Sequence, residues 1–357
     1  MRVFTCDCGA SVFFDNSQCL SCKRELGFAP DQLAVLTLGQ VRDGAFETPR
    51  GSYRKCANYV DQGVCNWLLP ADAAAELCQA CELNHVIPNL SEPENGALWQ
   101  EVEKAKRRLI YSLNQLGLPL LSKDQDAERG LSFDIKASVG NERVLTGHAD
   151  GLITLNLKEA DAAEREKMRL ALKERYRTLL GHFRHEVGHY YWDRLVRDGD
   201  RIQAFRDLFG DETDDYGAAL RRHYAAPPNP GYAESFISNY AASHPWEDFA
   251  ETFAHYLHVV DTLETAQQFG FAAPAAPHDF ETLMSEWYQL SVALNSLNRS
   301  MGLPDAYPFA ISATVKQKLG FVHELIQAAR RANSDATFSS STRAGPGTSE
   351  LSASTAV

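Results

Sequence analysis

The spacing of apolar and polar positions predicts that the chain after residue 90 is mainly helical. Apolar side chains that recur every three or four residues form one face of a helix, which packs against a core. The segment 332–357 lacks this pattern and is rich in Ser, Thr, Ala and Gly, so we expect a disordered tail there. The predicted helices cover residues 99–116, 159–175, 176–196, 200–222, 247–260, 279–297 and 313–331.

Two segments between these helices predict strands. Residues 131–139 alternate between apolar and polar side chains, which is the period of a half-buried strand. Residues 147–157 predict a second strand with a Gly-rich entry, and residues 140–142 predict a turn before it. The Pro-rich segment 226–231 predicts a loop. Helices and strands together predict an α+β fold that is mainly α.

Composition limits the classes of function that this chain can have. Its 357 residues, 44% of them hydrophobic, suffice for one large domain or two smaller ones. A net charge of -12 and a sequence pI of about 5.4 argue against nucleic acid or an anionic membrane as a partner. The chain has no apolar run of about 18 residues and no signal-peptide core near Met1, so we expect a cytoplasmic protein without a membrane span.

The 8 cysteines all precede residue 82, where they form two quartets. Two close pairs of cysteines can supply four thiolates to one tetrahedral zinc ion, and such closed sites stabilise a fold without catalysing a reaction. In a reducing compartment this arrangement predicts two structural zinc sites. Two disulfides, or sites interleaved between the quartets, are the alternatives. The quartets are Cys6, Cys8, Cys19 and Cys22, then Cys56, Cys65, Cys78 and Cys81.

Two histidines one helical turn apart are the most informative chemical signal in the chain. His185 and His189 project from one face of a predicted helix and can hold one metal ion together. Glu186 lies at the edge of that face, from which it can reach a water on the metal without binding the metal itself. This arrangement is typical of zinc peptidases. The alternative is a solvated or core-packed helix face.

A catalytic zinc requires a third protein ligand and an open position for water. Trp192 and Leu195 occupy the positions where metzincins have Gly and His, so that class is excluded. In gluzincins the third ligand is a glutamate on a downstream helix, and Pro245 suits the start of such a helix. Glu247 and Glu251 lie on one side of it, so one can bind zinc while the other orients a ligating histidine. Spacing alone leaves open which of the two glutamates is the zinc ligand.

The start of this helix resembles the active-site helix of lethal-factor-type gluzincins. Tyr240 lies seven residues before Glu247, and Phe-Ala-Glu follows closely after it. The resemblance implies that Glu247 is the third zinc ligand and that Tyr240 stabilises the developing oxyanion. A packed aromatic side chain is the alternative role for Tyr240.

Most of the chain, excluding the tail, is similar to a bacterial family of zinc-binding metallopeptidases with an N-terminal zinc-ribbon domain. The resemblance implies a zinc-ribbon region over residues 1–90, a small β module with four-cysteine zinc sites, and a zincin-like metallopeptidase domain over residues 91–331. It implies one catalytic and two structural Zn²⁺ ions. The residues that carry it are the quartet from Cys6 to Cys22 and the segments 147–151, 176–189 and 246–251.

These features predict a zinc metallopeptidase, an endopeptidase that cleaves a protein or peptide substrate. We expect Glu186 to activate the zinc-bound water, Tyr240 to donate to the oxyanion, and Glu251 to orient a histidine. One strand between residues 131 and 157 would align an extended substrate, and the ribbons would recruit a substrate or partner. The alternatives are a catalytically silent binding module with a zincin fold and a zinc-ribbon nucleic-acid binder.

Other polar side chains near these motifs have roles that the sequence leaves open. His182 precedes His185 by one helical turn, and we expect it to pack or to line the cleft. Metal binding is an alternative role for Asp248, His255 and His258, while His148 and Asp150 are either cleft residues or turn residues.

Overall fold

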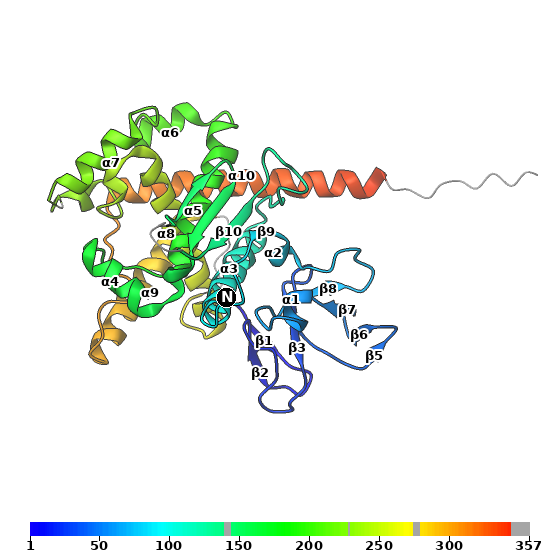
Figure 1. The fold of residues 1–357 in the computed structure, drawn as a ribbon. Helices are drawn as coiled ribbons and strands as arrows, with labels where there is room; N and C mark the ends of the chain where they lie inside the picture. Colours follow the sequence, from blue (N-terminus) through cyan, green and yellow to red (C-terminus); the bar gives the residue numbers. More distant parts are fainter. Residues whose placement is uncertain (139–143, 228, 274–278, 344–357) are drawn as a thin grey trace, which may run out of the picture.

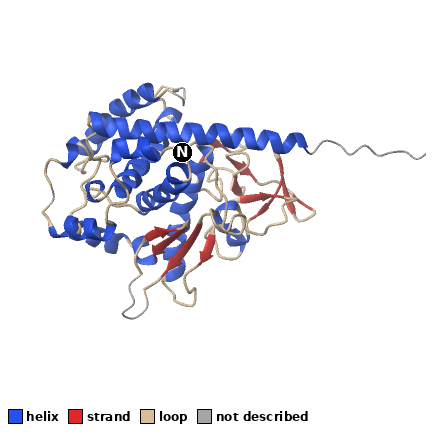
Figure 2. Ribbon diagram, turned by 90° about the horizontal axis from the view of Figure 1, so that it is seen from above, coloured by secondary structure: helices blue, strands red, loops and turns tan. Residues whose placement is uncertain are grey.

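Small sheets and long helices occupy different parts of the molecule in the computed structural model of the chain (Figure 1). The structure describes residues 1–138, 144–227, 229–273 and 279–343. Short strands dominate the first 90 residues and long helices dominate the remainder. Figure 2 shows the same helices and strands from above. The predicted α+β class, mainly α, is confirmed.

The cysteine-rich region folds into small antiparallel sheets. Two hairpins come first, and a meander with the strand order β5-β6-β7-β8 follows. Strands this short cannot bury a sizeable core by themselves. The elements are β1 (Val3–Thr5), β2 (Ser11–Phe13), β3 (Leu26–Ala29), β4 (Ala34–Thr37), β5 (Val41–Arg42), β6 (Ala45–Thr48), β7 (Gly51–Lys55), α1 (Ala57–Val60), β8 (Leu68–Pro70) and α2 (Gln79–Glu82).

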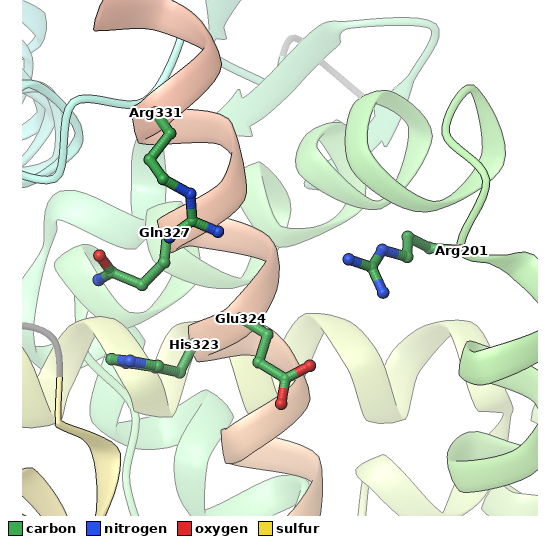
Figure 3. A pocket seen from close by; sticks show the side chains of 5 residues that line it. All are labelled: Arg201, His323, Glu324, Gln327 and Arg331. Carbon is green, nitrogen blue, oxygen red and sulfur yellow. The ribbon is translucent and has the colours of Figure 1, made fainter.

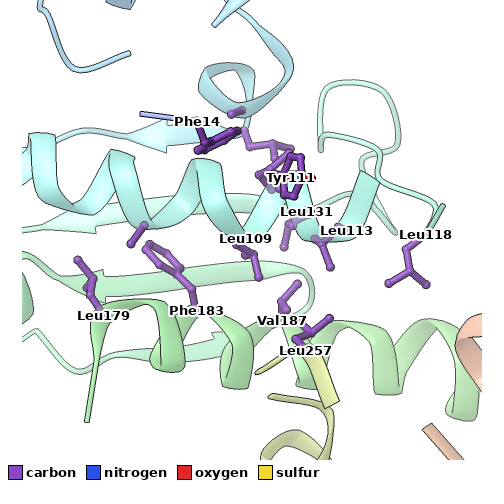
Figure 4. Close-up of a cluster of buried hydrophobic side chains, with 14 of the residues drawn as sticks. Phe14, Leu109, Tyr111, Leu113, Leu118, Leu131, Leu179, Phe183, Val187 and Leu257 are labelled. Carbon is purple, nitrogen blue, oxygen red and sulfur yellow. The ribbon is translucent and has the colours of Figure 1, made fainter. Parts of the chain in front are cut away.

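The cysteine-rich region shares its core with α3 (Asn95–Gln115), the first long helix. The ring of Phe14 lies 4.9 Å from that of Phe28 and 5.2 Å from that of Tyr111 on α3, measured between centroids. Trp67 packs against Phe28, also at 4.9 Å. Figure 4 shows Phe14 beside Tyr111, above the layer where α3 meets the next long helix. One hydrophobic core therefore runs from the ribbons into the helical part.

A four-stranded sheet lies beside the long helices, with the strand order β11-β12-β10-β9. β10 (Ser132–Lys136) runs parallel to both β12 (Leu152–Asn156) and β9 (Asn84–Val86). β11 (Gly147–Ala149) is antiparallel to β12 and forms one edge of the sheet. Phe133 of β10 packs on Phe183 of the histidine-bearing helix, so the sheet supports that helix.

The predicted strand over residues 147–157 is wrong in one respect, because the segment is a hairpin. Asp150 and Gly151 have φ angles of 47° and 79°, in the left-handed region, and reverse the chain between β11 and β12. A Cβ at Gly151 would also lie 2.2 Å from the carbonyl oxygen of Gly130, so only glycine fits. The turn predicted at residues 140–142 lies outside the described residues.

The remaining helices follow the predicted segments with few differences. The segment 200–222 forms two helices instead of one, since Gly210, with a φ of 102°, ends the first. The predicted loop at 226–231 contains residue 228, which lies outside the described residues. The elements are η1 (Leu157–Ala160), α4 (Ala162–Ala171), α5 (Leu179–Trp192), η2 (Asp193–Arg197), α6 (Ile202–Phe209), α7 (Tyr216–Ala225), η3 (Tyr232–Glu234), η4 (Ala241–Ser243), α8 (Pro245–Gln268), α9 (Phe280–Ser300) and α10 (Ala313–Arg343).

Two helix ends differ from the prediction. The α-helical part of α5 ends at Trp192 and gives way to the π-helical η2, so the regular helix is shorter than the predicted 176–196. Helix α10 continues beyond residue 332, where the predicted tail begins, and residues 344–357 lie outside the described part of the chain. None of the described helices combines the length and the apolarity that a membrane span requires.

Gly188 allows α5 and α8 to approach each other closely. A Cβ at position 188 would lie 2.9 Å from the Cα of Ala250 and 3.0 Å from its carbonyl oxygen. Both are backbone atoms of α8, so an added methyl group would push the two helices apart. Val187 and Phe253 are fully or almost fully buried beside this contact. The close approach sets the polar residues at the start of α8 against the histidines of α5.

We expect Gly188→Ala to lower the free energy of unfolding by about 1–3 kcal/mol, because the methyl group overpacks the α5–α8 contact. Urea unfolding followed by circular dichroism measures the change. The control is Gly96→Ala in α3, where an added Cβ meets nothing within 4 Å. That variant should keep its stability or gain about 0.5–1 kcal/mol, since alanine favours the helix. If both substitutions changed the free energy of unfolding equally, the close contact between α5 and α8 would be contradicted.

Candidate metal centre

Local sequence places the two helices that carry the site. Thr178 caps α5 by accepting a hydrogen bond on Oγ1 from the Gly181 amide at 2.9 Å. Helix α8 begins with Pro245 at its first turn, and His244 Nδ1 accepts a hydrogen bond from the Trp246 amide at 3.1 Å. Both caps lie close to the site residues, so the ends of the helices are fixed where those side chains project.

Three buried ligand atoms converge between α5 and α8. The Nε2 atoms of His185 and His189 lie 3.2 Å apart, and Glu247 Oε2 lies 3.0 Å and 3.4 Å from them. Zinc ligands at about 2.0–2.1 Å in a tetrahedron lie about 3.3 Å from one another, so the spacing fits that ion. Oε2 of Glu247 is buried and accepts no hydrogen bond among the described residues, which also suits a cation at this point.

Carboxylates on two sides make the surroundings of His185 strongly negative. Burial by itself raises the pKa of Glu247, but His189 and His185 outweigh it and hold the pKa well below its usual value. Burial likewise opposes the charged form of His185, yet Glu247 and Glu251 raise the pKa of that imidazole well above its usual value. Such a site favours a bound positive charge.

Glu251 lies behind His185 and outside the converging group. Its Oε1 lies 2.7 Å from His185 Nδ1, and its Oε2 accepts a hydrogen bond from Ser238 Oγ at 2.6 Å. Burial raises the pKa of Glu251, but the contact with His185 reverses this and lowers it to about 2. The geometry therefore places Glu247, and not Glu251, with the two histidines in the group that could hold a metal ion.

His189 lacks the equivalent support on its second nitrogen. Its Nδ1 is buried and has no hydrogen-bond partner among the described residues. The ring is held instead by Trp246, at 3.7 Å between centroids, and by His148 of β11, which stacks at 6.2 Å. Packing positions His189, whereas a carboxylate positions His185.

Glu186 directly follows His185 in α5, and Tyr240 packs beside His185. The buried carboxylate of Glu186 is near enough to contribute to a raised pKa of Tyr240, of which burial and then Glu247 are the larger causes. Tyr240 directly precedes η4, and its ring lies 5.8 Å from that of His185. A phenol with a raised pKa keeps its proton at neutral pH and can donate a hydrogen bond.

Tyr216 is a site residue that sequence reasoning missed. It begins α7, and its hydroxyl donates a hydrogen bond to Glu247 Oε1 at 2.6 Å. The two residues are 31 positions apart, and no motif connects α7 with α8. Only the folded arrangement of the helices shows their contact.

The alternative metal ligands have other partners. Asp248 pairs with Lys318 at 2.6 Å, His255 Nδ1 lies 2.8 Å from the Tyr307 hydroxyl, and His258 Nδ1 accepts from Arg184 at 2.6 Å. None of the three belongs to a metal-binding group among the residues that the structure describes.

The other residues whose roles the sequence left open, His182, His148 and Asp150, have different surroundings. His182 pairs with Glu159 of η1. His148 lies beside the metal ligands, and its Nε2 accepts a hydrogen bond from the Gly151 amide at 3.0 Å. Asp150 is a turn residue in the hairpin. Of these three residues, His148 is thus the one that reaches the site.

The cysteines form the two predicted quartets, and the interleaved alternative does not occur among the described residues. Sulfur atoms lie 3.6 Å apart in the pair Cys6–Cys22 and 3.7 Å apart in Cys8–Cys19 and Cys65–Cys78. A disulfide would bring two sulfurs to about 2.05 Å, whereas thiolates on a tetrahedral zinc lie about 3.8 Å apart. The quartets differ in exposure, since Cys8 is exposed and every member of the second is buried.

A polar pocket lies between α10 and Arg201, which precedes α6. It is separate from the histidine cluster and from the two cysteine quartets. Figure 3 shows its lining: Arg201 points toward α10, Glu324 projects from α10 on the side of Arg201, and His323 and Gln327 project on the opposite side. Among them, His323 Nδ1 is bonded to the Tyr256 hydroxyl at 2.8 Å. The lining is His323, Glu324, Gln327, Arg331 and Arg201.

Residues 95–325 match a family model described as "Putative zinc-binding metallo-peptidase". The chain belongs to this family. In this metallopeptidase-family protein, residues 3–92 match a model of a zinc-ribbon domain, so the predicted family resemblance is confirmed. Its zinc-binding character follows from both matches together with the cysteine and histidine clusters.

Relatives of this metallopeptidase-family protein extend over nearly its whole length. It is 44% identical over 336 residues to uncharacterized proteins of Mycobacterium bovis and Mycobacterium tuberculosis. The match covers 91% of this chain and 95% of each relative. No solved structure matches the chain.

We expect Glu247→Gln to lose one bound zinc ion per chain, because the neutral amide is a poor ligand and leaves the two histidines alone. Glu251→Gln should keep that zinc but bind it about 10–100-fold more weakly, since only the orientation of His185 is affected. Elemental analysis after dialysis against a graded chelator series measures both. If Glu251→Gln lost this zinc ion and Glu247→Gln only bound it more weakly, Glu251 would be the ligand.

Proposed function

We propose that this protein is a zinc-dependent peptidase of the gluzincin type that cleaves proteins or peptides internally. The observation that carries the proposal is the convergence of His185 Nε2, His189 Nε2 and Glu247 Oε2, with a buried glutamate, Glu186, directly after His185 on the same helix. Three ligands leave a fourth tetrahedral position for water, which is the arrangement of a catalytic zinc site and not of a structural one.

The chain's own residues supply the proton transfers that hydrolysis needs. Zinc, when bound, lowers the pKa of a coordinated water and polarises the scissile carbonyl. Glu186 accepts the proton of the attacking water and then delivers it to the leaving amine. Tyr240 donates a hydrogen bond to the oxygen on which negative charge develops, a contribution of about 3 kcal/mol in comparable sites. Glu251 holds His185 in the tautomer that presents Nε2 to the metal.

An extended substrate would pair with β11, which is an edge strand among the described residues. This strand pairs with β12 on one side, and its other side is the edge of the sheet. His148 in the middle of β11 stacks beside His189, so the strand edge runs past the ligand cluster. Backbone hydrogen bonding to such an edge would align a peptide without regard to most of its side chains. This supports a protein or peptide as the substrate class.

The two cysteine quartets support structural zinc sites, which gives three zinc ions per chain in total. We propose that the ribbons recruit a substrate or partner through the surface that α3 leaves uncovered. Reduced thiols of this kind suit the cytoplasm. The net charge of -12 weighs against the nucleic-acid binder.

The rival function is a binding module that has the same fold but no catalysis. Such a protein has no need for a carboxylate beside the metal ligands. The presence of Glu186 together with all three ligands favours the enzyme.

We expect Glu186→Gln to lower peptide hydrolysis about 10²–10⁴-fold while the zinc content stays at that of the wild type, because only the proton acceptor is removed. Unfolded casein and a peptide library, analysed for new N-termini by mass spectrometry, measure the change. The matched control is Glu166→Gln, at an exposed residue of α4, which should cleave like the wild type. If Glu186→Gln cleaved as fast as the wild type, Glu186 would be excluded as the base. If the wild type itself cleaved nothing, the binding module would be favoured.

A further inference from the structure

The two oxygens of Glu247 have different partners. Oε2 faces the two histidines, whereas Oε1 accepts the hydrogen bond from the Tyr216 hydroxyl at 2.6 Å. A carboxylate with both oxygens free can bind a metal through one oxygen or through two. In this protein Oε1 of Glu247 already accepts a hydrogen bond from the Tyr216 hydroxyl.

His244 links the segment before Tyr216 to the start of the helix that carries Glu247. Its Nδ1 accepts from the Trp246 amide at the start of α8, so the neutral ring carries its hydrogen on Nε2. Nε2 then donates to the carbonyl oxygen of Asp214 at 3.1 Å, two residues before Tyr216. One buried imidazole therefore ties the backbone before α7 to the first turn of α8.

Two further contacts hold the phenol in place. The ring of Tyr216 packs edge-on against Trp246, at 5.8 Å between centroids, and against His244 at 5.3 Å. Asp215 caps α7 by accepting a hydrogen bond from the Ala218 amide at 2.8 Å. The donor is thus positioned by the fold before any metal or substrate arrives.

A second Glu247 oxygen on the metal would have two consequences. It would take coordination space that a catalytic site keeps for water. It would also remove the acceptor from the Tyr216 hydroxyl, whose bond to Glu247 is partly buried, and the loss of that hydrogen bond is unfavourable. Both consequences favour a Glu247 that binds through Oε2 alone.

We infer that Tyr216 is a positioning residue that reserves one oxygen of Glu247 and thereby keeps the metal's water position open. The inference rests on the proposed function, because it concerns the same metal site. Tyr216 acts through Glu247, whereas Tyr240 is the donor to the substrate.

Cobalt absorption tests this role without relying on turnover. The histidine site is emptied with a mild chelator and refilled with Co²⁺, and the absence of thiolate–cobalt absorption verifies that the cysteine quartets keep their zinc. Four-coordinate Co²⁺ absorbs visible light several-fold more strongly than five-coordinate Co²⁺, so the spectrum reports the number of ligands. We expect an intense spectrum from the wild type and a several-fold weaker one from Tyr216→Phe, in which Glu247 can bind through both oxygens.

The control is Tyr288→Phe on α9, where the ring is 72% exposed, and it should give the wild-type spectrum. Thermal unfolding verifies that Tyr216→Phe is folded. If it is not, Asp215→Ala, which removes the cap of α7 and loosens the phenol, should weaken the spectrum in the same direction. A folded Tyr216→Phe with full Co²⁺ uptake and an unchanged spectrum would overturn the inference.

Hydrolysis separates this role from that of Tyr240. Tyr216→Phe should lower kcat about 10-fold or more with little change in KM, and its cobalt spectrum should change. Tyr240→Phe should lower kcat with an unchanged spectrum. A wild type that takes up Co²⁺ with the expected spectrum but cleaves nothing would overturn the proposed function and leave the assignment of Tyr216 supported. A wild type whose histidine site takes up no Co²⁺ would overturn both.

Discussion

The close contact of α5 with α8 is the constraint on which the site depends. Two ligands come from α5 and one from α8, so their atoms converge only if the helix backbones nearly touch. A glycine on one helix and an alanine on the other remove the side-chain volume that would separate them. The hydrophobic residues around this contact then stabilise an arrangement in which several charged groups are buried.

Buried charged groups are stable only with hydrogen-bond or ion-pair partners, and neighbouring side chains supply such partners around this site. The two carboxylates of α8 near the histidines each have a second partner: Tyr216 for Glu247 and Ser238 for Glu251. Unpaired charges in such a place would cost several kcal/mol each, so the hydrogen bonds around the site are part of its stability as well as its geometry. The site is therefore preorganised by neighbours that do not themselves bind metal.

Sequence reasoning found the parts of the site that local spacing encodes. One helical turn between His185 and His189, and another between Glu247 and Glu251, place each pair on a common face whatever surrounds the helices. It could not rank the two glutamates from spacing alone, because that depends on how α8 is rotated against α5. It missed Tyr216, whose contact with Glu247 arises from the packing of α7. It also read the hairpin at Asp150 as one strand, because the glycines before the apolar run indicate the entry of a strand as readily as a reversal of the chain.

The aromatic core shared by the ribbons and α3 makes the two halves of the chain thermodynamically dependent on each other. Phe14 and Phe28 pack on Tyr111 on one side of α3, and Trp67 packs behind them. The opposite side of that helix packs toward α5. Removing the first 90 residues would expose this aromatic surface to water instead of releasing an independent catalytic unit. Whatever stabilises the cysteine-rich region therefore also stabilises α3, which packs against the helix that carries the histidines.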